Sequence, residues 1–115
     1  MLAKANRITS GTDYRSVVRR GSRVVRPNTV TYVRSSTAGG PVRFGFIVAK
    51  NVGNAVTRNR VRRRMKAASL ELVSSVPAGT DIVIRALPSA ASTDWDTLRS
   101  EMAAAFTAQR KRTGR

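Results

Sequence analysis

Residues 50–66 read KNVGNAVTRNRVRRRMK. This stretch carries seven basic side chains and no acidic one. Gly53 and Asn54 are residue types that tolerate the left-handed backbone angles of tight turns, and Asn54 is also a favourable helix N-cap. The pattern predicts a strand that ends in a turn, followed by a helix from about Ala55 to Val73.

That helix is expected to be amphipathic. At about 100° per residue one stripe is apolar and comprises Val61, Met65, Ala68 and Leu72. The opposite side carries Asn59, Arg62, Arg63 and Lys66, and the flanks carry Arg60 and Arg64. One interpretation is an ordinary solvated face. Such a face usually mixes charges, because like charges at i, i+4 spacing repel one another, so this arrangement favours a bound polyanion.

The charge of the whole chain points the same way. The 115 residues carry a net charge of +16, with 22 Lys plus Arg against 6 Asp plus Glu. Nucleic acid, an anionic membrane or an acidic protein could each bind such a surface. Arginine outnumbers lysine 18 to 4, and guanidinium groups match phosphate geometry, which favours nucleic acid.

A membrane partner and a membrane location are disfavoured. The basic helix lacks the large apolar anchors of membrane-surface helices. No apolar run approaches the roughly 18 residues of a membrane span, and the N-terminus lacks a signal-peptide core. We therefore expect a cytoplasmic protein.

The residue types needed for most protein enzyme chemistry are missing. The chain has no cysteine and no histidine, which excludes disulfides, thiolate nucleophiles, imidazole bases and the usual zinc sites. The six carboxylates are scattered, and none forms an evident acid/base pair. The sequence predicts no catalytic residue, no metal site and no cofactor held by the protein alone.

The remaining segments predict one α+β domain over residues 1–115. Residues 1–7 form a basic lead-in that we expect to be loosely held. Ser10 and Asp13 form a capping box before a helix at 11–20, and Gly21 ends it. Strands are expected at 22–26, 29–35, 42–49 and 81–87, with a loop at 35–41. Thr93, with Asp94 and Asp96, begins the last helix, and residues 109–115 form a basic tail expected to be disordered until it binds a polyanion.

Strand alternation separates two kinds of face. Val30, Tyr32 and Arg34 share one side of their strand, a mixture typical of surfaces that stack bases, although an ordinary edge strand fits equally well. On the strand at 42–49, Val42, Phe44, Phe46 and Val48 are expected to face the core. Gly45 would permit a close approach or mark a bulge. The last helix buries Leu98, Met102, Ala105 and Phe106, and Trp95 is interpreted as a packing residue.

A family resemblance rests on the basic stretch. Lys50, Gly53, Ala55-Val56, Arg58-Asn59-Arg60 and Arg63-Arg64 are similar, in order and spacing, to the Arg-Asn-Arg motif of the bacterial ribonuclease P protein subunit, and Asn51 departs from a second lysine common there. The opening of the chain also resembles that family, through Arg7-Ile8, Asp13-Tyr14, Val17-Val18 and Gly21. The resemblance implies an α-β-β-β-α-β-α order with a small mixed sheet and a left-handed βαβ crossover.

The resemblance also implies a role. Members of the family assist removal of the 5′ leader of precursor tRNA, while a catalytic RNA and its magnesium ions carry the chemistry. The implied partners are that RNA and precursor tRNA, with no obligate protein partner. The implied RNA-binding residues are Lys50, Arg58, Asn59, Arg60, Arg62, Arg63 and Arg64, to which the helix wheel adds Lys66. The implied leader cleft comprises Tyr14, Val18, Val30, Tyr32, Ile47 and Phe106; Val18 stands where a phenylalanine is common, and the helix wheel places Phe106 in the core.

Two other classes of function stay open at this point. A ribosomal or general RNA chaperone would account for the charge but not for the ordered motif. A free-standing nuclease would need carboxylates grouped around a metal ion.

Overall fold

The computed structural model describes residues 2–35 and 39–113, with side chains as far as residue 108. Its helices and strands follow the predicted order: α1 (Gly11–Arg20), β1 (Ser22–Val25), β2 (Thr29–Ser35), β3 (Arg43–Ile47), α2 (Ala55–Leu72), β4 (Thr80–Ala86) and α3 (Trp95–Thr113). Short 3-10 turns occupy Lys4–Asn6, Lys50–Val52, Val73–Ser75 and Pro88–Ala91. The predicted α+β class is confirmed.

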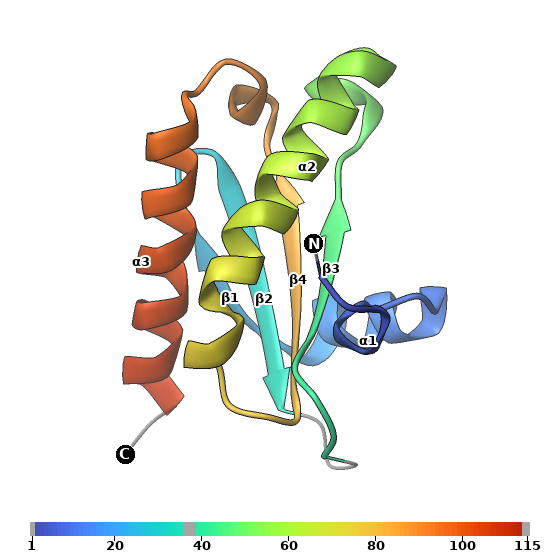
Figure 1. Cartoon of the computed structure of the whole chain (residues 1–115), viewed down its shortest axis with the longest axis vertical. Coiled ribbons are helices and arrows are strands. Elements are labelled where there is room, and N and C mark those ends of the chain that lie inside the picture. Colours follow the sequence, from blue (N-terminus) through green and yellow to red (C-terminus); the bar gives the residue numbers. More distant parts are fainter. Residues whose placement is uncertain (1, 36–38, 114–115) are drawn as a thin grey trace.

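The four strands form one mixed sheet in the order β1-β2-β4-β3. β2 pairs antiparallel with β1 and β4, and β3 pairs parallel with β4. In Figure 1, β3 and β4 both point upwards, α2 lies in front of the sheet, and β4 lies to the left of β3. The β3-α2-β4 crossover is therefore left-handed, against the usual hand of βαβ units.

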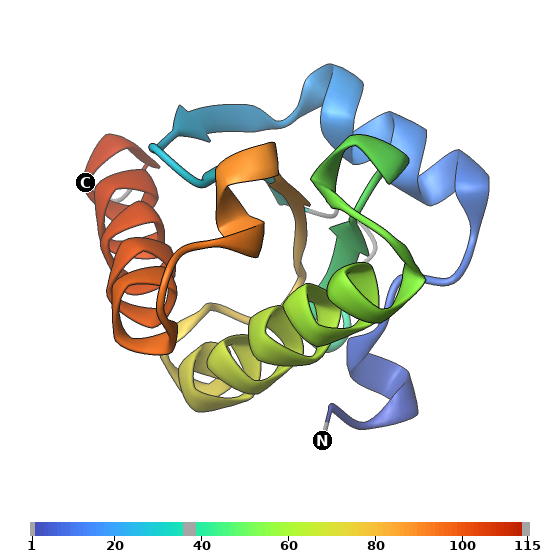
Figure 2. The same ribbon diagram turned by 90° about the horizontal axis from the view of Figure 1, so that it is seen from above.

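Helices cover both faces of the sheet. Seen from above, α2 and α3 lie on one side and α1 on the other (Figure 2). Phe44, Ile82 and Ile84 belong to the larger core, which α2 and α3 complete. Val83 projects to the opposite face and joins a smaller core beneath α1. The alternation along β4 thus divides the molecule into two apolar layers.

Side-chain caps begin the three helices. Ser10 Oγ accepts from Asp13 N at 3.4 Å, and Asn54 Oδ1 accepts from Thr57 N at 2.9 Å. Asp94 Oδ1 accepts from Thr97 N at 2.7 Å, so Asp94 caps α3. Each cap satisfies a backbone N–H that the first turn leaves without a partner.

Three expectations about the ends of elements were wrong. The lead-in is packed: Leu2 is buried in the larger core and Asn6 Nδ2 donates to the Val42 carbonyl at 2.7 Å. The strand expected at 42–49 is limited to Arg43–Ile47. The tail expected to be disordered from residue 109 continues α3 as far as Thr113, and residues 114–115 lie outside the described part.

Arg43 ties α1 to the sheet. Its guanidinium binds both oxygens of Asp81 on the neighbouring strand, at 2.9 and 2.8 Å, and reaches Asp13 Oδ2 in α1 at 3.2 Å. The hydrogen bonds to Asp81, with a smaller effect of Asp13, raise the pKa of Arg43 above its ordinary value. Asp13 therefore has a structural role in addition to its place in the helix cap.

Candidate nucleic-acid interface

The basic stretch forms α2 with the predicted orientation. Val61, Met65 and Ala68 are fully buried, and Leu72 packs at the edge of the larger core. Among the predicted RNA-binding residues, Lys50, Asn59, Arg60 and Arg63 are exposed, whereas Arg58, Arg62, Arg64 and Lys66 are half-buried. The predicted division of the helix into an apolar stripe and a cationic side is confirmed.

Two of the arginines also bind the protein itself. Arg60 Nη2 donates to the Ala91 carbonyl at 3.0 Å, and Arg64 Nη1 donates to the Thr93 carbonyl at 3.3 Å. Both carbonyl groups belong to the segment that precedes α3. These contacts fix the two guanidinium groups on the α3 side of the cationic face, and they leave the other N–H groups of each side chain as donors.

The turn before α2 needs Gly53. A Cβ at this position would lie 2.8 Å from Thr57 Cγ2, and the glycine has φ +158°. Asn54 has the extended backbone of an N-cap, so its expected tolerance of left-handed angles is not used. The local sequence therefore sets the chain direction from β3 into the basic helix.

On the other side of α2, cations meet an aromatic ring. A pocket of about 160 Å³ lies where the lead-in, α1, β3 and α2 converge. Its lining residues are Arg7, Ile8, Thr9, Tyr14, Phe44, Phe46, Arg62 and Lys66. A π-face beside guanidinium and ammonium groups is the combination that binds single-stranded nucleic acid. Sequence reasoning placed Tyr14 and Arg62 in different sites and assigned no role here to Arg7 or Phe46.

Most of the predicted leader cleft gathers on one face of the sheet. Val30 and Tyr32 are buried in the smaller core, and Tyr14, Val18 and Ile47 pack around them half-buried. Arg85 lies over the Tyr32 ring, with the guanidinium carbon 5.7 Å from the ring centroid. Tyr32 is 7% exposed, so a base could stack on it only if Arg85 moved.

The inclusion of Phe106 in this group was wrong. Phe106 lies in the larger core on the opposite face, stacked on Phe44 with ring centroids 6.0 Å apart. The helix wheel had placed it correctly, because the i, i+4 stripe of α3 faces the sheet.

The carboxylates in the described part of the chain have mainly structural partners. Asp13 and Asp81 bind Arg43, Asp94 caps α3, and Glu71 binds Arg99 at 2.7 Å. Within residues 2–35 and 39–108, no three acidic side chains group together as metal ligands would.

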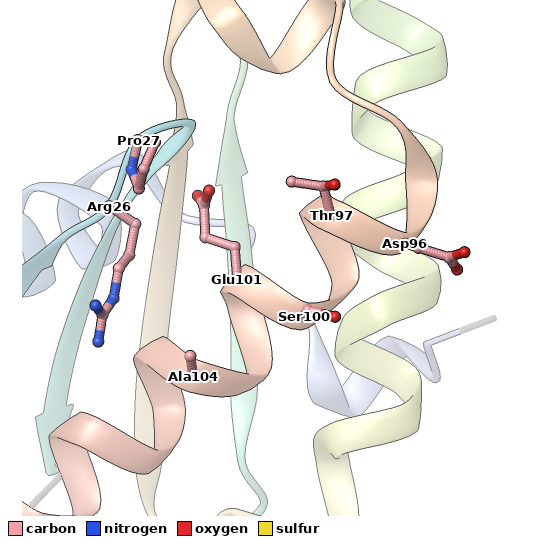
Figure 3. Close-up of a pocket in the computed structure, with 7 residues that line it drawn as sticks. All are labelled: Arg26, Pro27, Asp96, Thr97, Ser100, Glu101 and Ala104. Atoms are coloured by element: carbon pink, nitrogen blue, oxygen red, sulfur yellow. The ribbon is translucent and has the colours of Figure 1, made fainter.

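Glu101 anchors the turn between β1 and β2. It accepts from Asn28 Nδ2 at 2.9 Å, from Asn28 N at 3.2 Å and from Thr29 Oγ1 at 2.5 Å. A pocket of about 530 Å³ lies beside it, and in Figure 3 the Glu101 carboxylate points toward this turn while the Arg26 guanidinium points away from it. Because Glu101 and Asp96 line this pocket, it is a poor site for a polyanion.

Comparison of the whole sequence with known protein families agrees with the resemblance based on the Arg58-Asn59-Arg60 motif. The family model described as Ribonuclease P matches residues 2–110, nearly the whole chain. The chain belongs to the ribonuclease P protein family.

None of the helices in residues 2–35 and 39–113 is long and apolar enough to cross a membrane.

Curated relatives carry the same description. The "Ribonuclease P protein component" of Clavibacter michiganensis subsp. michiganensis is 57% identical over 107 residues, which cover 93% of this chain and 95% of the relative. The protein of that description from Kocuria rhizophila is 47% identical, with 96% and 98% covered. The role of ribonuclease P protein subunit in tRNA processing follows from this family membership.

Solved ribonuclease P proteins share the fold. A Staphylococcus aureus RNase P protein mutant with defective mRNA degradation activity superposes with a TM-score of 0.86 at 23% identity, covering 93% of this chain and 90% of that one. The RNase P protein from Thermotoga maritima gives a TM-score of 0.74 at 20% identity, covering 85% and 92%.

Proposed function

We propose that this ribonuclease P protein binds the catalytic RNA through the exposed side of α2 and holds the 5′ leader of precursor tRNA near Tyr14. The RNA and its magnesium ions carry out the hydrolysis, and the protein supplies no catalytic group. The observation that supports this assignment best is the pocket that Tyr14 of α1 lines together with Arg62 and Lys66 of α2.

The arrangement suits two separate RNA segments. Lys50, Asn59 and Arg63 project outwards from α2 and its preceding turn, where a folded RNA can reach them. Arg62 and Lys66 lie on the flank of the helix that borders the pocket, beside Tyr14. A phosphate held by these cations would place the adjoining base near the aromatic ring, and such contacts tolerate any base sequence.

Reconstitution tests this proposal. Purified protein, a bacterial ribonuclease P RNA, and the two together are each incubated with end-labelled precursor tRNA at a magnesium concentration where the RNA alone is slow. We expect mature 5′ ends from the mixture and none from the protein alone, since the described carboxylates other than Asp96 are held in structural contacts and no three of them group as metal ligands would.

Three results would contradict the proposal. Leader removal by RNA-free protein would place chemistry in the polypeptide. Absence of stimulation by the protein would remove the subunit role. Equal affinity for ribonuclease P RNA and for bulk RNA would indicate a general RNA chaperone instead.

A further inference from the structure

The side of α2 opposite the Tyr14 pocket has a hollow of its own. A pocket of about 250 Å³ is lined by Arg60, Arg63, Arg64, Ala67 and Trp95. The small side chain of Ala67 leaves room between the arginines and the indole. Trp95 is half-buried, with part of its ring against the larger core and part in this pocket.

The arginines line the same pocket as the Trp95 indole, but none of them stacks on the face of its ring. Arg60 and Arg64 are each held by a backbone carbonyl of the segment before α3. Within residues 2–35 and 39–108, the one guanidinium over an aromatic ring is that of Arg85 over Tyr32. No arginine therefore covers Trp95, although three of them line the same hollow.

Arg63 is the arginine of this pocket whose guanidinium group has no partner in the described part of the protein. It is exposed, and no hydrogen bond or ion pair joins it to another residue of the described part. The hydrogen bonds of Thr97, and to a smaller extent the charge of Arg64, lower the pKa of the Asp94 carboxyl, so one arginine of the pocket interacts with this acid. Among the described residues no acidic one lines the pocket, so its three guanidinium groups leave it positive.

We infer that this pocket receives a single unpaired nucleotide of a folded RNA, with its base against Trp95 and its phosphate on Arg63. An indole is a large stacking surface for a base, and stacking of this kind contributes about 1 to 3 kcal/mol per base. Arg60 and Arg64 are already fixed in place, so they lose little freedom if they also contact the phosphate held by Arg63. The inference rests on the proposed function, because it assigns one contact of the RNA-binding face.

Trp95 is the chain's single tryptophan, so tryptophan fluorescence, excited selectively over that of the two tyrosines, reports on this pocket alone. The probes are a perfectly paired RNA hairpin and the same hairpin with one bulged adenosine, titrated at one salt concentration. We expect the bulged hairpin to quench Trp95 emission more strongly and to bind at least about 5-fold more tightly.

Variants separate stacking from packing. Trp95→Phe keeps an aromatic ring and should keep the preference for the bulge. Trp95→Leu fills the core but cannot stack, so it should bind both hairpins alike. Lys50→Ala is the control, because Lys50 is exposed and lines neither this pocket nor the Tyr14 pocket, and it should weaken both hairpins equally.

Two results would overturn the inference: equal quenching and equal affinity for the two hairpins, or a bulge preference that survives in Trp95→Leu. If the wild-type protein still selects ribonuclease P RNA over bulk RNA in either case, the proposed function stands and only the nucleotide pocket fails. If the wild-type protein does not select ribonuclease P RNA over bulk RNA, both the proposed function and the nucleotide pocket are contradicted.

Discussion

The ring of Tyr14 lies against the backbone of Gly45. A Cβ on Gly45 would be 2.5 Å from Tyr14 Cε1, closer than any side chain allows. The Tyr14 hydroxyl also accepts a hydrogen bond from Phe46 N, at 3.1 Å. An absent side chain on β3 thus sets the position of the aromatic ring that we assign to the leader site.

Gly45→Ala should therefore move Tyr14. Overpacking of this kind costs about 1 to 3 kcal/mol, which urea denaturation can measure. In the background of Tyr14→Ala, which removes the ring, the same substitution should cost less than half as much, because the two positions are coupled. Additive effects in the double mutant would show that the contact is not made.

The Arg43 bridge should contribute far more to stability than the exposed pair of Arg99 with Glu71. The Asp81 side chain is 11% exposed, whereas the side chains of Arg99 and Glu71 are 50% and 48% exposed. Arg43→Met leaves a nearly buried carboxylate without its partner and should cost at least about 2 kcal/mol of unfolding free energy. Arg99→Met is the control and should cost under about 1 kcal/mol. Similar losses in both would contradict this ranking.

Asp94 should make stability depend on acid pH. Its hydrogen bonds with Thr97, and to a smaller extent the charge of Arg64, lower the pKa of the carboxyl from its ordinary 3.8. A lowered pKa stabilises the fold above pH 3.8, and this contribution disappears as pH falls through the folded-state value. Asp94→Ala should thus be less stable than wild type at pH 7, with a smaller difference at pH 3. If the difference in stability between wild type and Asp94→Ala is as large at pH 3 as at pH 7, the effect does not come from the charge of the Asp94 carboxylate.

Salt dependence should distinguish arginines that bind RNA from those that also hold the fold. Arg63→Ala should lower the slope of log affinity against log salt for ribonuclease P RNA by about 0.7 to 0.9, with an unchanged melting temperature. Arg60→Ala also loses the bond to the Ala91 carbonyl, so it should lower the unfolding free energy by about 1 kcal/mol as well. An unchanged slope in Arg63→Ala would place the RNA interface elsewhere.

Local patterns were sufficient to predict most of the fold. Capping residues and the apolar stripes of 3.6-residue period located α1, α2 and α3, and alternation located the strands. The packing of Leu2 and Asn6 was not predictable, because it depends on long-range contacts with the sheet. The left-handed crossover came from family resemblance alone, since general rules favour the opposite hand.

The candidate site was predicted in part. The cationic face of α2 follows from its sequence. The two pockets on the flanks of α2 depend on which neighbours lie beside them, and periodicity does not reveal those neighbours. Trp95 illustrates this: its expected packing role is confirmed, but Ala67 and the carbonyl contacts of Arg60 and Arg64 are what open the hollow beside it.

We propose that the catalytic RNA and the leader bind different parts of this protein. The most direct test is the ratio of affinities of the reconstituted holoenzyme for precursor tRNA and for mature tRNA, in wild type and in Tyr14→Ala. We predict that Tyr14→Ala lowers this ratio about 10-fold while assembly with ribonuclease P RNA and the circular dichroism spectrum stay unchanged. An unchanged ratio in a folded Tyr14→Ala protein that assembles normally would contradict the account.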